Sequence, residues 1–345
     1  MQLQDVSLPA PANAPGGPPA RQRRPSPLAA NPAARVKVIV NPVSGHKAGI
    51  TTNAAGRAEV QAALDATGIR ADVFETQAPE DGTVLALEGL DEHYDLVVAC
   101  GGDGTVDDVA AALIDTPQIL GIVPLGSANN VARMLHVPFD LDGAVRLLCE
   151  GEVHCIDVGR VGDRIFLETA GVGLDAALFP LLSQLDHGAY FTLLEAARTF
   201  WRWRPVRMSL WLDGRRLRVR ATMVLVANGP YWGYSVPLAP DAKVNDHRLD
   251  VLVFENFSKW DLVRHVVASF LGRGQARDPA TGQTINRRVY HPRVRTYQAR
   301  VVKITSRRRL PVHGDARPVG HTPITISIKT NALNVITGRG EHVTA

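Results

Sequence analysis

The stretch "CGGDGTVDDVA" (residues 100–110) decides the fold, because an apolar β-branched run ends at its first residue and a helix-like segment follows its glycines. The same alternation of apolar run, turn and helical segment recurs around "VKVIV" (36–40), "ADVFE" (71–75) and "QILGIV" (118–123). Such alternation predicts βαβ units and a parallel sheet covered by helices on both faces. We therefore expect an α/β domain with a parallel sheet over residues 35–152.

From residue 153 onward the pattern changes to short strands separated by turn residues, such as "HCIDVGRV" (154–161) and "RMSLWLDG" (207–214). Regularly spaced strands of this kind predict a C-terminal antiparallel β-sandwich domain over residues 153–345, whose last residues can return to the first domain. Two helical inserts are expected, over residues 189–203 and 258–271.

The N-terminal segment and the composition limit the class of protein. Residues 1–34 are rich in Pro and Ala and predict a disordered tail, without the apolar core of a signal peptide. The net charge of +4 indicates only a mild attraction to anionic surfaces. Cys100, Cys149 and Cys155 lack metal-ligand spacing and suggest neither a disulfide framework nor a zinc site. These features fit a cytoplasmic protein, and no apolar run approaches the roughly 18 residues of a membrane-spanning helix.

Three loops of unusual composition follow strands of the first domain: "NPVSG" (41–45), "GGDGT" (101–105) and "PLGSANN" (124–130). Since the carboxyl ends of parallel strands meet at one edge of a sheet, these loops can converge on one ligand. Glycines let backbone N–H groups approach an anion, and the helix after them adds its positive end. Asp103 opposes this field unless a cation lies between carboxylate and phosphate. The alternative is a tight turn in which Asp103 caps its helix.

These loops, in this order and spacing, resemble the diacylglycerol kinase catalytic-domain family, which includes bacterial lipid kinases, sphingosine kinases and ceramide kinases. Three later segments extend the resemblance: "GVGLDA" (171–176), "VANGPYWGYSVPLAPDAKVNDHRLDVLVF" (226–254) and "PVHGDARPVGHTP" (311–323). "GGDGT" alone is shared with NAD kinases and phosphofructokinases. The resemblance implies an NAD kinase/phosphofructokinase-like first domain, a lipid-binding sandwich domain, and ATP-dependent phosphorylation of a lipid hydroxyl at the cleft between them, with Mg²⁺ and ATP as cofactors.

Carried onto this sequence, the resemblance implies a set of nucleotide contacts: Asn41, Thr76, Gly101, Gly102, Asp103, Gly104, Thr105, Val106, Asp107, Gly126, Ser127 and Asn129. The chain departs from the family in this region. Asp107 and Asp108 replace the more usual Asn and Glu, Ser127 stands where Thr is frequent, and Asn130 replaces a common Asp.

The resemblance implies that Asp315 is the catalytic base and that Asp103 organises the ion or the loop. Ala316 and Arg317 stand where the family has Gly and Glu, so Arg317 either contacts phosphate or pairs with Asp315. A register shifted by two would place His313, Gly314 and Asp315 at this motif, but it breaks the match to the residues that follow.

The resemblance also implies a magnesium ion in the second domain, held by the Asp246 carboxylate and the carbonyls of Lys243 and Arg248. His247 stands where the family has Gly, so a turn without metal is an equal alternative.

The segment "HGAYFTLLEAARTFWRWRP" (187–205) mixes aromatic residues with arginines, which suits a membrane interface. We expect most of Phe191, Leu194 and Trp201 to pack on the sandwich instead. Further arginines at 215–220 and 307–309 are expected to be solvated strand ends, with anionic headgroups as the alternative partner. No nucleic-acid reader motif accompanies them.

The function predicted is a lipid kinase for diacylglycerol or a sphingoid-type lipid, peripheral at the inner membrane face, with ATP and lipid as partners and with sandwich edges able to form a homodimer. The alternatives are a kinase of a soluble acceptor, like NAD kinase, and a nucleotide- or lipid-binding regulator that has lost catalysis.

Overall fold

The computed structural model describes residues 24–31, 33–47, 50–51, 55–78, 80–186, 192–233, 236–255, 260, 275–277, 284–286 and 294–338. Its N-terminal part is built on four parallel strands: β2 (Val36–Val40), β5 (Ala71–Glu75), β6 (Leu96–Gly101) and β7 (Ile119–Pro124). They are ordered β5-β2-β6-β7, and β2, β6 and β7 are buried along their full length. The predicted parallel α/β domain is confirmed.

Helices cover this sheet: α2 (Arg57–Ala66), α3 (Asp81–Asp91), α4 (Asp103–Leu113), α5 (Asn130–Met134) and α6 (Leu141–Glu150). α3 packs beside α4 and α2 contacts α6, so the helices form two separate groups on the sheet. A short hairpin of β3 (His46–Lys47) and β4 (Ile50–Thr51) extends from the first loop.

The second half is antiparallel, as the strand pattern predicts. Its longer strands are β8 (Glu152–Val161), β10 (Thr169–Gly173), β11 (Val206–Leu212), β12 (Arg215–Ala227), β15 (Leu249–Glu255), β18 (Val294–Ala299), β19 (Val301–Ser306), β20 (Pro311–Gly314), β21 (Arg317–His321) and β22 (Ile324–Thr337). Its short strands are β9 (Arg164–Phe166), β13 (Tyr231–Trp232), β14 (Val236–Pro237), β16 (Gln275–Arg277) and β17 (Thr284–Asn286).

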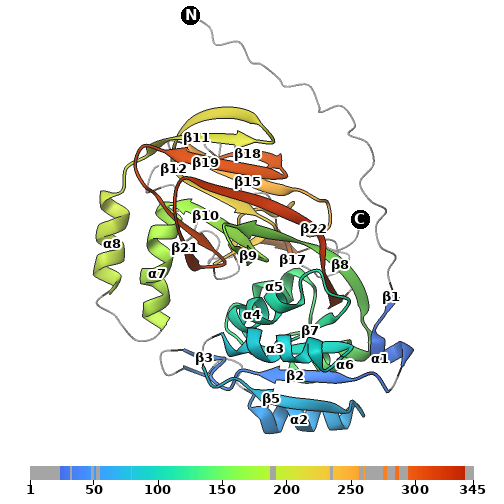
Figure 1. Cartoon of the computed structure of the whole chain (residues 1–345). Coiled ribbons are helices and arrows are strands. Elements are labelled where there is room, and N and C mark those ends of the chain that lie inside the picture. Colours follow the sequence, from blue (N-terminus) through green and yellow to red (C-terminus); the bar gives the residue numbers. More distant parts are fainter. Residues whose placement is uncertain are drawn as a thin grey trace, which may run out of the picture.

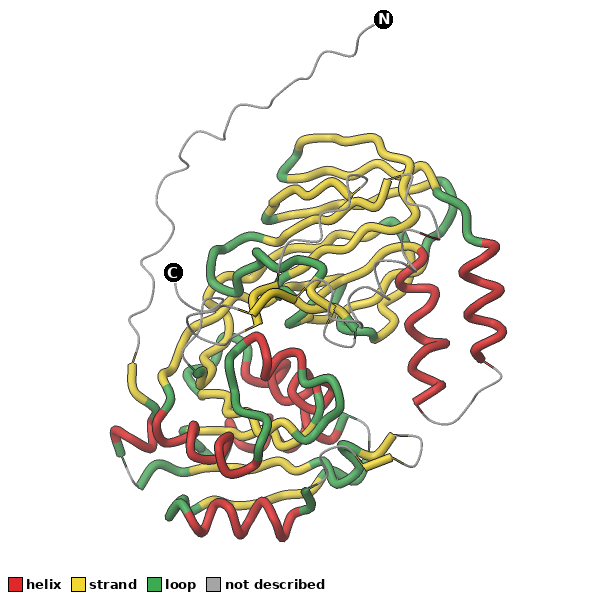
Figure 2. The backbone as a smooth tube through the Cα atoms, turned by 180° about the vertical axis from the view of Figure 1, so that it is seen from behind, coloured by secondary structure: helices red, strands yellow, loops and turns green. Residues whose placement is uncertain are grey.

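Two long strands join the halves into one sheet (Figures 1 and 2). β22 pairs with β19 near its start, runs antiparallel to β8 from Ile326 to Thr337, and pairs parallel with β7 at Asn334 and Val335. Each half keeps its own hydrophobic core. The two domains therefore share backbone hydrogen bonds, which fixes how the loops of one face the turns of the other.

Two helices, α7 (Leu174–Asp186) and α8 (Thr192–Arg202), stand side by side at one side of the sandwich (Figure 1). Only the second coincides with the expected insert at 189–203, and α7 was not expected. The expected packing of Leu194 and Trp201 on the sandwich is wrong: their exposed fractions are 78% and 50%. The small residues Thr192 and Ala196 occupy the buried face of α8 instead. Phe191 and most of 258–271 lie outside the described residues.

The expectation of a disordered tail up to residue 34 is wrong for its last part. β1 (Arg24–Pro25) pairs with the start of β8, and the short helix α1 (Pro27–Ala30) follows. Ser26 between them is fully buried, and its hydroxyl donates to the carbonyl of Leu148. This buried hydrogen bond fixes the segment against α6. No helix in the part of the chain that the structure describes is long and apolar enough to cross a membrane.

Candidate active site

The three glycine-containing loops meet at the carboxyl edge of the parallel sheet. The Asn41 amide donates to Oγ1 of Thr105 at 3.0 Å, and the Gly102 N–H donates to Oγ of Ser44 at 3.3 Å. A Cβ at Gly126 would lie 2.5 Å from the Cα of Gly102, so the second and third loops can come this close because position 126 is glycine. The predicted convergence of the loops is therefore present in the structure.

The other predicted nucleotide contacts lie at this edge with different environments. Thr76 follows β5, and its N–H donates to the Val40 carbonyl at 2.9 Å. Ser127 is exposed, whereas Asn129 is buried and closes its own loop by exchanging hydrogen bonds with Gly126. Val106 points into the core of the first domain. Ser127 is thus exposed at this edge, while Asn129 shapes the loop and the Val106 side chain packs in the core.

Asp103 begins α4, and its carboxylate faces its own N–H and also caps the start of a second helix, α5. Its carboxylate accepts the N–H of Val131 at 3.1 Å and also faces the N–H groups of Asn129 and Asn130, at the start of α5. Burial raises the pKa of Asp103, and these backbone donors oppose the rise. The carboxylate in the phosphate-type loop is therefore held by amides of the third loop, and it locks the two loops together.

Asp315 lies in the turn between β20 and β21, where it and Ala316 both have positive φ (43° and 63°). Its carboxylate accepts the backbone N–H groups of Leu167 at 2.5 Å, Glu168 at 3.1 Å and Thr169 at 2.8 Å. Burial raises its pKa to about 6, against the lowering effect of these amides. A base whose pKa lies near the working pH suits proton transfer.

His313, the first residue of the alternative register, is a buried residue of β20. Its Nε2 lies 2.5 Å from Oδ2 of Asp175, and its Nδ1 accepts the N–H of Ala316 at 3.3 Å. Trp232 donates to the other oxygen of Asp175 at 2.9 Å. His313 therefore braces the turn that carries Asp315, which agrees with the ungapped register.

Two further carboxyl groups face the same buried space. Asp107 is half-buried, and its pKa is raised well above the usual range by burial and then by the charge of Asp315. The pKa of Glu168 is likewise raised well above the usual range, by burial and by the charges of Asp103 and Asp315. Glu168 was not among the predicted residues. Its Oε2 accepts the Asn130 amide at 2.7 Å, so the carboxylate absent at position 130 is supplied across the cleft by the second domain.

The nearest signal for Glu168 in the sequence is a single acid within the apolar segment "RIFLETAG" (164–171), which strand periodicity alone does not distinguish from a solvated position.

Arg317 forms its ion pair with Asp108 and not with Asp315. Its Nη1 lies 2.5 Å from Oδ1 of Asp108, and its Nη2 donates to the Gly104 carbonyl at 3.0 Å. The Arg for Glu exchange is thus matched by an acid on the first turns of α4. The pair links the β20–β21 turn of the second domain to the nucleotide loop of the first.

The Ala316→Gly variant is expected to be more stable than the parent by about 0.5–1 kcal/mol, because a Cβ at φ 63° strains the backbone while glycine adopts this conformation freely. Urea unfolding monitored by circular dichroism measures the difference. Gly233→Ala, at φ 56° in a turn with open space around the Cβ position, should shift stability in the opposite direction. A destabilised Ala316→Gly would mean that the turn is not held in this conformation.

The residues of this site fit Mg²⁺ only when the ion is also bound by the phosphates of a nucleotide. No group of three or more His, Cys, Asp or Glu side chains among the described residues is arranged to hold a metal ion. Oδ1 of Asp107, however, is buried and has no hydrogen-bond partner. Mg²⁺ is typically bound by one or two carboxylates together with substrate phosphates, and Asp107 offers such an oxygen.

The turn of the second domain that was predicted to bind a metal ion is held by hydrogen bonds within the protein. Oδ1 of Asp246 accepts the Arg248 N–H at 3.0 Å. The buried Asp157, which the sequence did not single out, accepts the N–H of His247 at 2.7 Å and lies 3.0 Å from its ring. The assignment of Lys243, Asp246 and Arg248 to a metal stays a prediction, and no step proposed below depends on it.

Comparison with known proteins agrees with this geometry. Residues 35–161 match the diacylglycerol kinase catalytic domain, and residues 172–337 match the YegS C-terminal NAD kinase beta sandwich-like domain. The diacylglycerol kinase of Staphylococcus saprophyticus is 24% identical over 294 residues, which is 84% of this chain and 90% of that protein. That of Staphylococcus aureus is 25% identical over 294 residues, which is 84% of this chain and 88% of that protein.

A crystal structure of a putative diacylglycerol kinase from Bacillus anthracis has the same fold, with a TM-score of 0.69 at 22% identity over 88% of this chain and 97% of that one. The loops, the buried carboxyl groups and the two domain matches lead to one assignment. The chain belongs to the diacylglycerol kinase catalytic domain family and carries a YegS-like C-terminal domain.

Proposed function

We propose that this protein is an ATP-dependent lipid kinase that transfers the γ-phosphate to the hydroxyl of diacylglycerol or of a sphingoid-type lipid. The observation that carries the proposal is the group of buried carboxyls, Asp315, Asp107 and Glu168, placed against the loop that begins α4. Carboxyl groups whose pKa values are raised by burial and by one another are typical of sites that move protons.

In the proposed reaction Asp315 orients the lipid hydroxyl and accepts its proton. The hydroxyl oxygen forms a bond to the γ-phosphorus, the bond to the bridging oxygen breaks, and ADP leaves. The three amides that hold Asp315 fix its direction, and the Arg317–Asp108 pair keeps its turn against the nucleotide loop. Mg²⁺, when bound with ATP, neutralises charge on the phosphates. Phosphoryl transfer depends on such positioning and electrostatics more than on a strong base.

The test is phosphate transfer from labelled ATP with Mg²⁺ to a panel of lipids in mixed micelles, with NAD in a parallel reaction. We expect label in a lipid and a lower rate for Asp103→Ala, because Asp103 ties the second loop to the third. Asp142→Ala is the control, since Asp142 is an exposed Asp in the first turn of α6, on the other part of the domain.

Label on NAD would replace the lipid assignment with a soluble acceptor. ATP binding without transfer to any acceptor would favour a regulator instead.

A further inference from the structure

The helix α8 has a buried side and an outer side. Thr192 and Ala196 are buried, as is Trp203 just beyond the last turn. With 3.6 residues per turn, Leu194, Arg198, Trp201 and Arg202 fall together on the opposite side. All four are exposed. The outer side of α8 thus presents an apolar edge directly beside a basic edge.

Exposed apolar side chains gather at this helix. Of the nine large hydrophobic residues that are exposed among those described, four lie here: Leu193, Leu194, Trp201 and Trp260, with exposed fractions of 56%, 78%, 50% and 64%. The rings of Trp201 and Trp260 meet edge to face, with centroids 5.5 Å apart. An exposed apolar patch rimmed by polar residues marks an interaction site rather than ordinary surface. We call these four residues the α8 patch.

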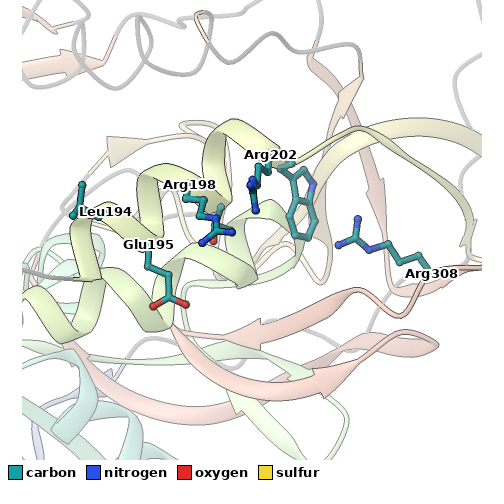
Figure 3. A pocket seen from close by; sticks show the side chains of 7 residues that line it. Leu194, Glu195, Arg198, Arg202 and Arg308 are labelled. Carbon is teal, nitrogen blue, oxygen red and sulfur yellow. The ribbon is translucent and has the colours of Figure 1, made fainter.

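A pocket of about 600 Å³ opens beside the α8 patch. Arg198 and Arg202 line it from α8, and Arg308 approaches from the segment between β19 and β20 (Figure 3). The Arg308 guanidinium lies 5.1 Å from the ring centroid of Trp203, and the Trp203 indole is fixed by a 3.0 Å hydrogen bond to the Thr222 carbonyl. Three cationic groups from two elements therefore converge around a fixed aromatic wall.

Among the described residues, no ion pair balances the charge of this pocket. Glu195 also lines it, but no ion pair joins a carboxylate to Arg198, Arg202 or Arg308 in the part of the chain that the structure describes. Arginine binds phosphate through two parallel hydrogen bonds, which makes it suited to recognise a phosphate group. Within the described residues, the three arginines of this pocket therefore have no anionic partner.

We propose that the pocket binds the phosphate of an anionic phospholipid in a bilayer while the α8 patch enters the headgroup boundary, so that α8 anchors the protein to the membrane away from the nucleotide cleft. Tryptophan is favoured at this boundary because its ring is apolar and its N–H is polar. The apolar edge of α8 suits the acyl-chain side of this boundary, and the basic edge suits its phosphate side. The inference extends the proposed function by naming where the kinase contacts the membrane, but binding itself does not require catalysis.

The experiment measures sedimentation of the full chain with vesicles of phosphatidylcholine alone or mixed with phosphatidylglycerol. The parent should bind the mixed vesicles, bind the neutral ones weakly, and lose affinity as salt is added. At about 1 kcal/mol for each basic residue, or about fivefold, the triple variant R198Q/R202Q/R308Q should bind about 10²-fold more weakly. The control R215Q/R216Q/R218Q removes the same charge from exposed positions of β12 and should retain most of the affinity.

A second variant tests the apolar edge. L194S/W201S should weaken binding to mixed vesicles while leaving the arginines in place. Its circular dichroism should match the parent, and its thermal unfolding should fall only slightly, because Leu194 is exposed and Trp201 loses its ring contact with Trp260. Equal losses in the α8 and β12 arginine variants would reduce the effect to net charge and overturn the proposal. Equal affinity of the parent for single-stranded RNA and for mixed vesicles would also overturn it, in favour of a general polyanion surface.

The inference and the proposed function fail in different ways. Transfer of phosphate to a short-chain diacylglycerol in neutral detergent should be unchanged in R198Q/R202Q/R308Q, since these residues lie outside the cleft. A parent that binds anionic vesicles through α8 but phosphorylates no lipid would retain this inference and end the kinase assignment. A parent that phosphorylates lipid but shows no preference for anionic vesicles would support the kinase assignment and overturn this inference.

Discussion

Replacing Asp315 with Asn is expected to lower kcat for phosphate transfer by about 10²- to 10⁴-fold, the usual contribution of a general base. The amide cannot take the proton of the attacking hydroxyl. Binding of ATP should change little, because the nucleotide loops are formed by other residues. Single-turnover transfer from labelled ATP measures the first quantity, and equilibrium binding of a labelled nucleotide measures the second.

Loss of structure is the competing explanation, because the Asp315 carboxylate also organises backbone amides of residues 167–169. Asp213→Asn is the matched control. Asp213 also has positive φ, in the β11–β12 turn, and its carboxylate accepts the N–H groups of Arg300 at 3.0 Å and Val301 at 2.8 Å. If Asp213→Asn lowered kcat as much as Asp315→Asn, the effect would be structural and the assignment of the base would fail.

The pH dependence of the parent gives an independent check. A base acts in its deprotonated form, so a pKa of about 6 for Asp315 predicts that kcat falls as the pH is lowered through about 6. A carboxylate with an ordinary pKa of about 4 would leave kcat constant over that range.

The fold was predictable where local pattern and burial agree. The runs at 36–40 and 95–100 are almost entirely apolar because both faces of a parallel sheet are covered, and they became β2 and β6. The loops after them converge because all parallel strands end at one edge. Asp315 was reached by resemblance, and the structure places it in a turn facing these loops.

The features that the sequence did not predict depend on contacts between segments that are far apart in the chain. Whether Leu194 and Trp201 face the protein or the solvent depends on which side of α8 meets α7, and α7 was not expected. The Arg317–Asp108 pair joins residues 209 positions apart. Asn130 could be recognised as a missing carboxylate, but its replacement by Glu168 became visible only once β10 and α5 were placed on the two sides of the cleft.

Replacing Glu168 with Gln is the second change with a large expected effect, and it separates stability from catalysis. Burial raises the pKa of Glu168 far above its value in the unfolded chain. An acid whose pKa is higher in the folded chain than in the unfolded chain stabilises the folded state at pH values below its unfolded pKa, which is about 4.3 for Glu. This stabilisation is lost as the pH rises through the folded pKa. Above that pH the parent carries the cost of a buried charge, and Gln does not.

We therefore expect Glu168→Gln to be more stable than the parent by roughly 1–3 kcal/mol near pH 8 and nearly equal to it near pH 4. The Gln side-chain oxygen can still accept the Asn130 amide, so the hydrogen bond across the cleft survives. Urea unfolding at the two pH values measures the difference. Glu59→Gln is the control, because Glu59 is exposed and accepts a single backbone N–H, that of Gly56 at 2.9 Å.

The acid limb of the kcat profile should stay where it is. The charge of Asp315 raises the pKa of Glu168, so Asp315 loses its proton first and Glu168 is still uncharged when it does. The acid limb of kcat should therefore remain near pH 6 in Glu168→Gln. A limb that moved to lower pH in this variant would mean that Glu168 is already charged when Asp315 titrates, and would contradict the raised pKa of Glu168. A variant with no activity at any pH would make Glu168, rather than Asp315, the group that takes the proton.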